Sequence, residues 1–445
     1  MLPLSVKSIG ELLNYKIDDS KIVLGVSVNS KLVKKQDLFF ALPGSKQDGH
    51  SFLQEVSQRG AVAAIVSSNY SGDDFGLSLI KVFDVLKALQ RLAEWYLHFH
   101  RPKVVGITGS LGKTTTKDFT TTLLRSRYKV GCTPGNANSR IGVPLSILGM
   151  QEPCDILVVE MGQSEPGDLK SLVQVVPPDI AVITTVAYVH ACNFESLQQI
   201  AISKAEILSH PATKVGIVNK SMPFVQDVCK SGACIKRTFS CNDKNADHYI
   251  KKEEDRAHIY YKQKKCISIP WSIMGDHNLQ NYLAAVVVAR ECLVSYEEIK
   301  MASENLRLPH NRLERIEKKG ITFINDAYNA SEQSVCAALS SLPKPHPGKK
   351  KIAVLGDMKE LGKFSESAHR VVGKYALQYV DQLFCLGDGC QVMQEYWDLA
   401  KKTIVFAENK EDLIMRLKAS IEPGDVVLIK GSRSHGLDSL IEEMD

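Results

Sequence analysis

The sequence predicts an α/β protein of three domains, and three observations support this prediction. The chain has 445 residues, which is too long for one hydrophobic core and, at roughly 150 residues per domain, corresponds to about three. Short apolar runs alternate with helical patterns along most of it, as parallel sheets require. A glycine-rich phosphate loop follows one of these runs. We therefore expect a small N-terminal α/β domain, a central doubly wound nucleotide domain with a P-loop, and a C-terminal Rossmann-like domain.

The first domain is predicted over residues 1–83, where turn signals at Pro43-Gly44 and Asp48-Gly49 separate short strands. The expected strands are residues 25–28, 37–42 and 63–66. After them, apolar residues recur at helical spacing from Val85 to Leu97. We expect this helix to connect the first domain to the second.

The second domain is predicted over residues 84–311, because its strands are each followed by a loop and a helical pattern. The expected strands are residues 104–108, 156–159, 180–183 and 215–218. Residues 236–270 are charged and interspersed with short apolar runs, which predicts a hairpin excursion before a helix at 278–289.

The third domain is predicted over residues 312–445, where a second series of strands alternates with helical segments. These strands are residues 322–324, 352–355, 383–386, 404–406 and 426–429. They predict a second Rossmann-like sheet.

Composition and charge exclude several classes of protein. The net charge of +5 comes from 55 basic and 50 acidic residues mixed along the chain, which is too little for a nucleic-acid partner. No apolar run approaches the roughly 18 residues that span a bilayer, and the Met-Leu-Pro-Leu start lacks the zones of a signal peptide. The 11 cysteines form no C-x-x-C pair, which indicates reduced thiols in a cytoplasm.

The phosphate loop runs from Thr108 to Thr115, after an apolar strand and at the start of a helix. Backbone N–H groups and a helix N-terminus cradle phosphates in that context. Lys113 would bridge the β and γ phosphates of a nucleotide, and Thr114 would give its hydroxyl to Mg²⁺. The alternative is a glycine-rich turn without a function.

Two further residues lie at the predicted carboxyl edge of the same sheet. Glu160 ends the apolar run 156–159 and is the first candidate for a protein ligand to Mg²⁺, although it could also be a helix cap or a surface glutamate. His190 follows the strand that ends at Thr185, and its alternative is a structural role.

Lys204 falls within the apolar stripe of a predicted helix. One interpretation is an aliphatic stem that lies along the protein with its ammonium in water. The other is a desolvated lysine with a depressed pKa, which could react with carbon dioxide and become a metal-binding carbamate.

With these residues in view, the chain resembles the Mur ligases, the ATP-dependent amide ligases that build the peptide of the bacterial cell-wall precursor. The resemblance covers essentially the whole chain. Its motifs are the G-x-x-G-K-T-T-T loop from Gly109 to Thr116, the N-x-N-x-x-I-G-x-P run from Asn136 to Pro144, Glu160-Met161-Gly162, His190, Lys204, and His277-Asn278 with Asn281.

Within the family, the chain is most similar to the branch that joins D-alanyl-D-alanine to UDP-N-acetylmuramoyl tripeptide. The motifs for this are the segment from Asp37 to Gly44 with Asp48-Gly49-His50-x-Phe52, the run from Asp326 to Ala330, the segment from Leu355 to Gly362, and Lys430-Gly431-Ser432-Arg433. The D-N-P-R motif of the sister branch, which adds diaminopimelate or lysine to the UDP-dipeptide, is missing from the sequence. That branch, folylpolyglutamate synthase and a non-catalytic ATP-binding regulatory protein remain as alternatives.

The resemblance implies ATP and two Mg²⁺ ions as cofactors, a monomer, and a role for each residue that matches a family motif. It makes Lys113, Glu160, His190 and Lys204 catalytic, with Lys204 carbamylated, and makes Thr114, Glu160, His190 and Lys204 metal ligands. The nucleotide contacts would be Thr108, Gly109, Ser110, Leu111, Gly112, Lys113, Thr114, Thr115, Asn136, Asn138, Asn278, Arg312 and Asp326. The substrate contacts would be Ser30, Gly44, Asp48 and His50 for the UDP end, and Asn329, Lys430, Ser432 and Arg433 in the third domain.

The sequence departs from the family pattern at several of these positions. Leu111 replaces a polar residue of the loop, and Cys192 replaces an acidic residue two positions beyond His190. Further departures are Asn29-Ser30-Lys31 for D-S-R, Ser139 for asparagine, and Ala330-Ser331-Glu332 for A-N-P, which bears on recognition of the dipeptide.

Overall fold

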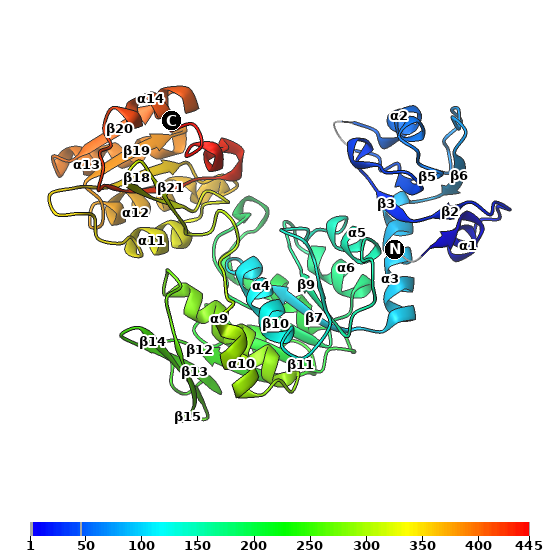
Figure 1. The fold of residues 1–445 in the computed structure, drawn as a ribbon, viewed down its shortest axis with the longest axis horizontal. Coiled ribbons are helices and arrows are strands. Elements are labelled where there is room, and N and C mark those ends of the chain that lie inside the picture. The colour runs from blue at the N-terminus through cyan, green and yellow to red at the C-terminus, as the bar shows by residue number, and fades with distance from the viewer. Residues whose placement is uncertain (1–2, 45–46, 445) are drawn as a thin grey trace.

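The computed structural model describes residues 3–44 and 47–444, so of the Met1–Leu4 start only Pro3 and Leu4 lie within the described part. Its strands gather into three large sheets, each flanked by helices, and one two-stranded pair. The N-terminal and C-terminal sheets lie on either side of the central one (Figure 1). The predicted three-domain α/β fold class is therefore confirmed.

The N-terminal sheet is parallel, with the strand order β3-β4-β5-β6. Strand β4 is buried along its whole length, because Leu38 and Phe40 face one apolar cluster and Phe39 faces another. The elements of this region are β1 (Leu4–Ser5), α1 (Val6–Leu12), β2 (Ile22–Val23), β3 (Gly25–Ser27), β4 (Asp37–Phe40), α2 (Leu53–Gln58), β5 (Ala63–Ser67) and β6 (Ser78–Val82).

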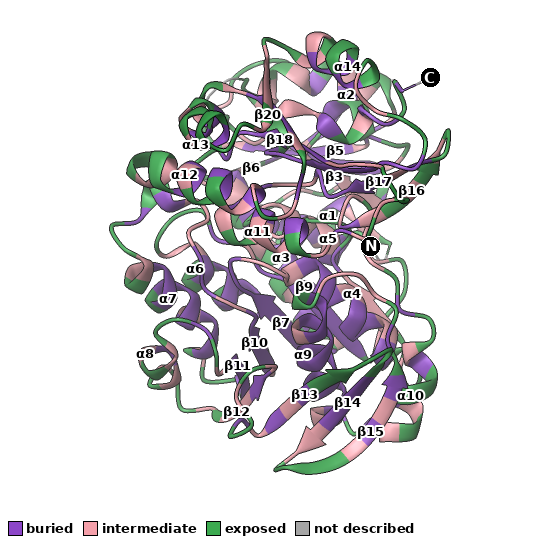
Figure 2. Cartoon of the chain, turned by 90° about the vertical axis from the view of Figure 1, so that its left-hand side faces the viewer, coloured by how far each residue is buried: buried purple, intermediate pink, exposed green. Residues whose placement is uncertain are grey.

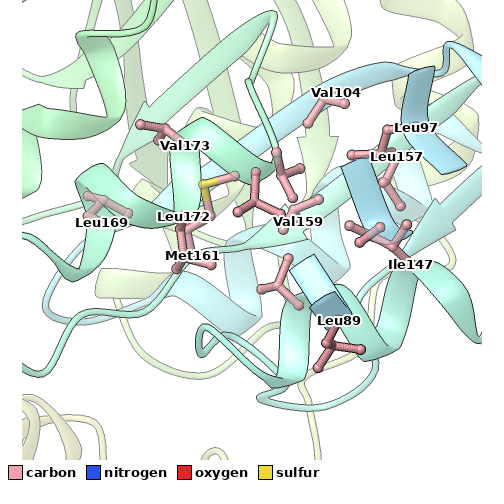
Figure 3. Packing of buried hydrophobic residues seen from close by; sticks show 14 of the residues in the cluster. Leu89, Leu97, Val104, Ile147, Leu157, Val159, Met161, Leu169, Leu172 and Val173 are labelled. Carbon is pink, nitrogen blue, oxygen red and sulfur yellow. The ribbon is translucent and has the colours of Figure 1, made fainter. Parts of the chain in front are cut away.

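The predicted connecting helix is present as α3 (Val85–His100). The Asp84 side chain caps its start by accepting a hydrogen bond from the backbone N–H of Lys87, and Arg101 ends it in a left-handed conformation. Its apolar face carries Leu89 and Leu97, which pack in one cluster with Leu157 of the central sheet (Figure 3). The helix therefore shares its core with the central domain.

The central sheet has the order β15-β14-β13-β12-β11-β10-β7-β9-β8 and is parallel from β13 to β8. The hairpin predicted within 236–270 is present, but it continues this sheet as an antiparallel edge and is not a separate excursion. The strands are β7 (Lys103–Thr108), β8 (Val130–Cys132), β9 (Ile156–Glu160), β10 (Ile180–Ile183), β11 (Val215–Asn219), β12 (Ile235–Ser240), β13 (His248–Glu253), β14 (Arg256–Tyr261) and β15 (Lys264–Pro270).

Helices cover both faces of the central sheet, so its middle strands β7, β9, β10 and β11 are buried almost throughout (Figure 2). One face carries α4 (Lys113–Leu124), α9 (His277–Glu291) and α10 (Tyr296–Ser303). The other carries α5 (Gly142–Leu148), α6 (Asp168–Val175), α7 (Leu197–Ala205) and α8 (Val225–Cys229). This two-sided cover explains why the parallel strands are continuous apolar runs.

The C-terminal sheet has the order β16-β17-β21-β18-β19-β20, and only the pairing of β16 with β17 is antiparallel. Its strands are β16 (Glu314–Lys318), β17 (Ile321–Asn325), β18 (Lys351–Gly356), β19 (Gln382–Leu386), β20 (Thr403–Ala407) and β21 (Val426–Lys430). Helices α11 (Glu332–Ser340), α12 (Ser365–Ala376) and α13 (Gln394–Leu399) cover one face, and α14 (Lys410–Lys418) covers the other. The loops after β17, β18 and β21 leave the carboxyl edge of this sheet.

Short 3₁₀ helices complete the fold. They are η1 (Ser30–Leu32), η2 (Gly49–Phe52), η3 (Ala191–Asn193), η4 (Glu206–Leu208), η5 (Gly362–Phe364), η6 (Asp388–Met393), η7 (Arg433–His435) and η8 (Leu437–Ser439). None of the helices within residues 3–44 and 47–444 is both long and apolar enough to cross a membrane.

Candidate active site

The phosphate loop joins the end of β7 to the start of α4, in the strand-loop-helix arrangement that the sequence predicts. Gly109 and Gly112 have φ angles of 146° and 80°, which favour glycine. A Cβ atom at Gly112 would overlap the side chain of Asn281 on α9, and one at Gly109 would overlap Thr184. These two glycines are required because the backbone of the loop is pressed against two neighbouring elements. That the loop binds a phosphate stays a prediction.

Two side chains of the loop hold its backbone in place. Lys113 donates from Nζ to the carbonyl oxygen of Gly109 at 2.8 Å, and burial lowers its pKa. The hydroxyl of Ser110 donates to the carbonyl of Ala187 and accepts from the N–H of the same residue, each at 2.9 Å. The backbone N–H of Ser110 donates to the carbonyl of Thr185 at 2.8 Å, so both the backbone and the side chain of Ser110 are tied to the segment after β10.

Glu160 lies beside the loop, at the end of β9, and is only 1% exposed. Its Oε2 accepts a hydrogen bond of 2.8 Å from the hydroxyl of Thr114, and its Oε1 accepts one of 2.7 Å from the amide of Asn138. Its backbone N–H donates to the hydroxyl of Thr133 at 3.0 Å. A surface glutamate is therefore excluded, and a buried carboxylate stands next to the hydroxyl that the sequence assigned to Mg²⁺.

His190 lines a cavity together with Lys113 and Glu160, and Lys204 lies near Lys113. His190 has a left-handed backbone, and its Nδ1 pairs with a carboxylate oxygen of Glu360 from the C-terminal domain. Burial lowers the pKa of His190, and the positive charges of Lys113 and Lys204 lower it further, although Glu360 opposes them. Lys113 and Lys204 thus lie near the same imidazole.

Lys204 is 5% exposed, so the interpretation with an ammonium in water is wrong. Burial first, and the nearby charge of Lys113 second, hold the pKa of Lys204 well below its usual value. Among residues 3–44 and 47–444, no carboxylate forms an ion pair with it. The surroundings therefore disfavour the protonated form of Lys204 relative to an exposed lysine.

Two adjoining cavities meet at the phosphate loop, between the central and C-terminal domains. Both include Leu111, Gly112, Arg312 and Ser334 in their walls. The first, of about 230 Å³, is also lined by Thr115, Thr184, Thr185, His277, Asn278, Gln280, Asn281, Leu313, Asp326, Gln333, Ala337 and Lys430. The second, of about 260 Å³, is also lined by Ser110, Lys113, Thr114, Asn136, Asn138, Glu160, Ser164, Val189, His190, Tyr328, Asn329, Ala330, Ser331 and Arg433.

The C-terminal domain brings several of the residues selected from the sequence to these cavities. Lys430 and Asp326, at the ends of β21 and β17, form a buried ion pair of 2.5 Å, and Lys430 also donates to the carbonyl of Asn329 at 3.0 Å. Ser432 is 8% exposed and starts the loop that carries Arg433. Asn278, on α9, donates to the carbonyl of Met274 and accepts from Asn281.

Tyr328, Ser334 and Glu360 were not selected as site residues from the sequence. The guanidinium carbons of Arg312 and Arg433 lie 3.9 Å and 5.7 Å from the centre of the Tyr328 ring. Tyr328 and Glu360 lie inside two motifs, Asp326–Ala330 and Leu355–Gly362, whose resemblance was noted without assigning a role to these two side chains. That membership is the signal that could have identified them.

The residues predicted for the UDP end gather in the N-terminal domain and line neither cavity. Asp48 accepts hydrogen bonds from the backbone of His50 at 3.0 Å and from its Nδ1 at 2.6 Å. The Nε2 of His50 accepts from the backbone of Ser67 at 2.9 Å, so both ring nitrogens are used within the domain. Ser30 is buried at the start of η1, and Gly44 precedes a part of its loop that is outside the described residues.

Comparisons with known proteins agree with this architecture. Three family descriptions match the chain: "Mur ligase family, catalytic domain" over residues 23–96, "Mur ligase middle domain" over 107–289, and "Mur ligase, glutamate ligase domain" over 311–433. The chain belongs to the Mur ligase family, which confirms the resemblance seen in the sequence.

Individual relatives are similar over nearly the whole chain. A protein of Bacillus subtilis named UDP-N-acetylmuramoyl-tripeptide–D-alanyl-D-alanine ligase is 31% identical, over 100% of this chain and 99% of its own. The structure of MurF ligase from Thermotoga maritima in complex with ADP has 29% identity and a TM-score of 0.81, and covers 94% of this chain and 96% of its own. A structure of MurF from Acinetobacter baumannii has 26% identity and a TM-score of 0.87, and covers 99% of this chain and 98% of its own.

The side chains beside the phosphate loop fit a magnesium nucleotide. Mg²⁺ prefers oxygen ligands and is commonly held by one or two carboxylates together with substrate phosphates. Thr114 and Glu160 supply such oxygens 2.8 Å apart. Within residues 3–44 and 47–444, no group of three or more His, Cys, Asp or Glu side chains is arranged to hold a metal alone. A nucleotide that brings its own phosphate oxygens would complete the ligand set.

Proposed function

We propose that this chain is an ADP-forming ligase that joins D-alanyl-D-alanine to UDP-N-acetylmuramoyl tripeptide. The observation that carries the proposal is the pair of cavities at the phosphate loop, where Lys113, Thr114 and Glu160 of the central domain face Arg312 and Arg433. Relatives along the full chain carry the name of this ligase. The comparisons give no support to the diaminopimelate-adding or lysine-adding ligase, or to a non-catalytic nucleotide-binding protein.

The proposed reaction has two steps. A carboxylate oxygen of the tripeptide attacks the γ-phosphorus of ATP, the bond to the β-phosphate oxygen breaks, and ADP leaves with its electron pair. The amine of the dipeptide then attacks the carbonyl carbon of the acyl phosphate, inorganic phosphate leaves, and the amine loses a proton. Phosphoryl transfer of this kind needs mainly alignment and neutralisation of charge.

The side chains at the cavities are suited to the first step. Lys113 and Arg312 place positive charge at the phosphate loop, where negative charge must be compensated. Mg²⁺, held by Thr114 and Glu160, would supply further charge compensation on the phosphate oxygens. The walls from the C-terminal domain would exclude water, which would otherwise hydrolyse the acyl phosphate.

We extend the proposal to the three regions of the chain. Residues 1–83 would hold the UDP end, with Ser30, Gly44, Asp48 and His50 as contacts. Residues 84–311 would bind ATP, and residues 312–445 would close on it and bind the dipeptide. We also predict that the chain acts as a monomer and that it works in the cytoplasm, where ATP is available.

A second Mg²⁺ near His190 and a carbamate on Lys204 are part of the same proposal. The buried, cationic surroundings of Lys204 support it, because they favour the neutral amine that reacts with carbon dioxide. Lys204→Ala should lose ADP release and regain part of it when short carboxylic acids are added. Failure of that rescue, together with no carbamate on the intact lysine near neutral pH, would reject the modification.

The first experiment measures ADP release with two substrate pairs. One pair is UDP-N-acetylmuramoyl tripeptide with D-alanyl-D-alanine, and the other is the UDP-dipeptide with diaminopimelate or lysine. Turnover with the first pair alone is the expected result. Turnover with the second pair alone would assign the chain to the sister branch, and no substrate-dependent ADP release with either pair would favour the non-catalytic alternative.

A further inference from the structure

The central and C-terminal domains are joined beside the second cavity by a small contact that we call the clasp, formed by residues 188–192 and 360–364. The backbone N–H of Cys192 donates to the carbonyl of Glu360 at 3.1 Å. The rings of Tyr188 and Phe364 lie 4.4 Å apart at 30°. Ala191, although it comes from the central domain, is buried in the apolar cluster of the C-terminal domain. The clasp is therefore packed and hydrogen-bonded rather than a passing surface contact.

The two segments of the clasp approach closely at Gly362. Gly362 has a φ of 54°, and a Cβ atom there would lie 3.2 Å from the Cα of Cys192. Glu360 and His190 both have left-handed backbones, with φ angles of 62° and 54°. Non-glycine residues adopt this conformation at a cost, so the surrounding structure fixes it. The backbone segments that carry the two side chains are thus fixed on either side of the domain boundary.

The side chains of His190 and Glu360 meet at the clasp. Nδ1 of His190 pairs with Oε2 of Glu360, while His190 also lines the second cavity with Lys113 and Glu160. A carboxylate accepts hydrogen bonds only, so this pair requires the proton of a neutral imidazole to be on Nδ1. The lone pair is then on Nε2, for which no partner is found among the described residues.

We propose that Glu360 is a positioning residue for His190, which fixes the ring with its proton on Nδ1 and presents the lone pair of Nε2 to the cavity. The inference rests on the proposed function, in which His190 acts at the phosphate end of the nucleotide. Because Glu360 belongs to the C-terminal domain, His190 acquires this orientation only when the clasp is formed. Docking of that domain and preparation of His190 are therefore one event.

The sequence around His190 is consistent with this role. Cys192, two positions after His190, is uncharged, and the ion pairs of the described chain give His190 no acidic partner other than Glu360. Carboxylates that accept from the second nitrogen of a ligating histidine generally hold its tautomer and orientation, and their loss costs roughly 10- to 100-fold in metal affinity or activity. The acidic partner is thus supplied from another domain.

The test compares Glu360→Ala, Glu360→Gln and the control Glu366→Ala in the full chain. Glu366 is an exposed carboxylate of the same domain whose ion pair with Arg370 lies on the surface. The first measurement is the tautomer of the His190 ring, from long-range ¹H–¹⁵N spectra of protein labelled at histidine, with His190→Asn used to assign the signal. The second is kcat and KM for ADP release with the tripeptide and D-alanyl-D-alanine.

Glu360→Ala should move His190 away from the Nδ1-protonated form and lower kcat by roughly 10- to 100-fold. Glu360→Gln should retain the tautomer, because its amide oxygen still accepts from Nδ1, and should keep more activity than the alanine variant. Glu366→Ala should match the unmodified chain in both measurements. Glu360 is 58% exposed in its side chain, so these variants are expected to fold.

The inference is overturned if Glu360→Ala keeps the Nδ1-protonated ring, or if the tautomer changes while kcat stays within about twofold of Glu366→Ala. The tautomer is measured without turnover, so it tests Glu360 even if the unmodified chain fails to release ADP with this substrate pair. Such a failure would reject the proposed function instead.

Discussion

The hydroxyl of Thr114 donates a hydrogen bond of 2.8 Å to Oε2 of Glu160, across the boundary between helix α4 and strand β9. The two residues are 46 positions apart in the sequence. They meet because β7 and β9 are adjacent parallel strands, so the loop after β7 and the last residue of β9 share one edge of the sheet. The same edge receives Asn138, which holds the other oxygen of Glu160.

Replacing Glu160 by Gln should lower ADP release by roughly 100-fold or more, because the neutral amide removes the negative charge proposed to hold Mg²⁺. The concentration of Mg²⁺ that gives half-maximal turnover should rise as well. Steady-state assays across a Mg²⁺ titration measure both. Glu165→Gln, which changes an exposed glutamate five residues later, is the control. Unchanged Mg²⁺ dependence in Glu160→Gln would remove Glu160 from the ligand set.

Gly112→Ala should abolish tight nucleotide binding. Gly112 precedes helix α4 with a φ of 80°, and a Cβ atom would overlap the buried side chain of Asn281, so the loop or that side chain would have to move. Gly167→Ala is a matched control, since Gly167 precedes helix α6 with a φ of 85° but has open space around it.

Both variants carry the same backbone cost, of roughly 1–2 kcal/mol for an L-residue in the left-handed region, and only Gly112→Ala adds the overlap. Fluorescent ATP titration should show at least a tenfold weaker affinity in Gly112→Ala and a nearly unchanged one in Gly167→Ala. Equal affinities would mean that the loop tolerates displacement.

Much of the fold could be predicted from the sequence because the parallel strands are covered on both faces. The runs at 156–159, 180–183 and 352–355 lie inside β9, β10 and β18. Strand β8 was missed, since its three residues, Val130–Cys132, are all only half-buried and give no apolar run. The hairpin after β12 was recognised, but its place at the edge of the central sheet depends on pairing that no local pattern shows.

The residues of the site also differ in how far the sequence could predict them. The place of Lys113 and Thr114 at a helix start, and of Glu160 at the end of a strand, could be predicted because each position follows from the pattern of its own segment. The burial of Lys204 excludes the interpretation with its ammonium in water, and its carbamylation stays a prediction. Glu360 could not be found from its own segment, because its side chain is largely exposed and its partner His190 lies 170 residues earlier, in another domain.

Lys430→Met should destabilise the C-terminal domain by roughly 3–5 kcal/mol, because it leaves the carboxylate of Asp326 buried without its partner. The double variant Asp326→Asn with Lys430→Met should recover much of this loss. Lys349→Met breaks a surface ion pair of the same domain, with Glu422, and should cost less than about 1 kcal/mol. Urea unfolding measures all three. A cost for Lys430→Met no larger than for Lys349→Met would show that water reaches Asp326.

The stability of the central domain should fall between pH 6.5 and pH 4 through His248. This residue, at the start of β13, is 4% exposed, and burial lowers its pKa to about 4, although Asp247 opposes the change. In that interval the unfolded chain binds a proton that the folded chain does not, so acid favours unfolding. The difference between this pKa and the ordinary value of 6.5 corresponds to a loss of about 3 kcal/mol in the free energy of unfolding once the folded and unfolded chains are both protonated.

His248→Phe tests this contribution, because a phenyl ring can keep the packing against Tyr261, 4.8 Å away, and cannot be protonated. The variant should lose less stability than the unmodified chain as the pH falls from 6.5 to 4, as measured by urea unfolding at several pH values. His310→Gln changes a largely exposed histidine and should lose as much stability as the unmodified chain when the pH falls from 6.5 to 4. If His248→Phe loses as much stability as the unmodified chain between pH 6.5 and pH 4, the imidazole must gain its proton without unfolding, and water must reach the start of β13 in the folded chain.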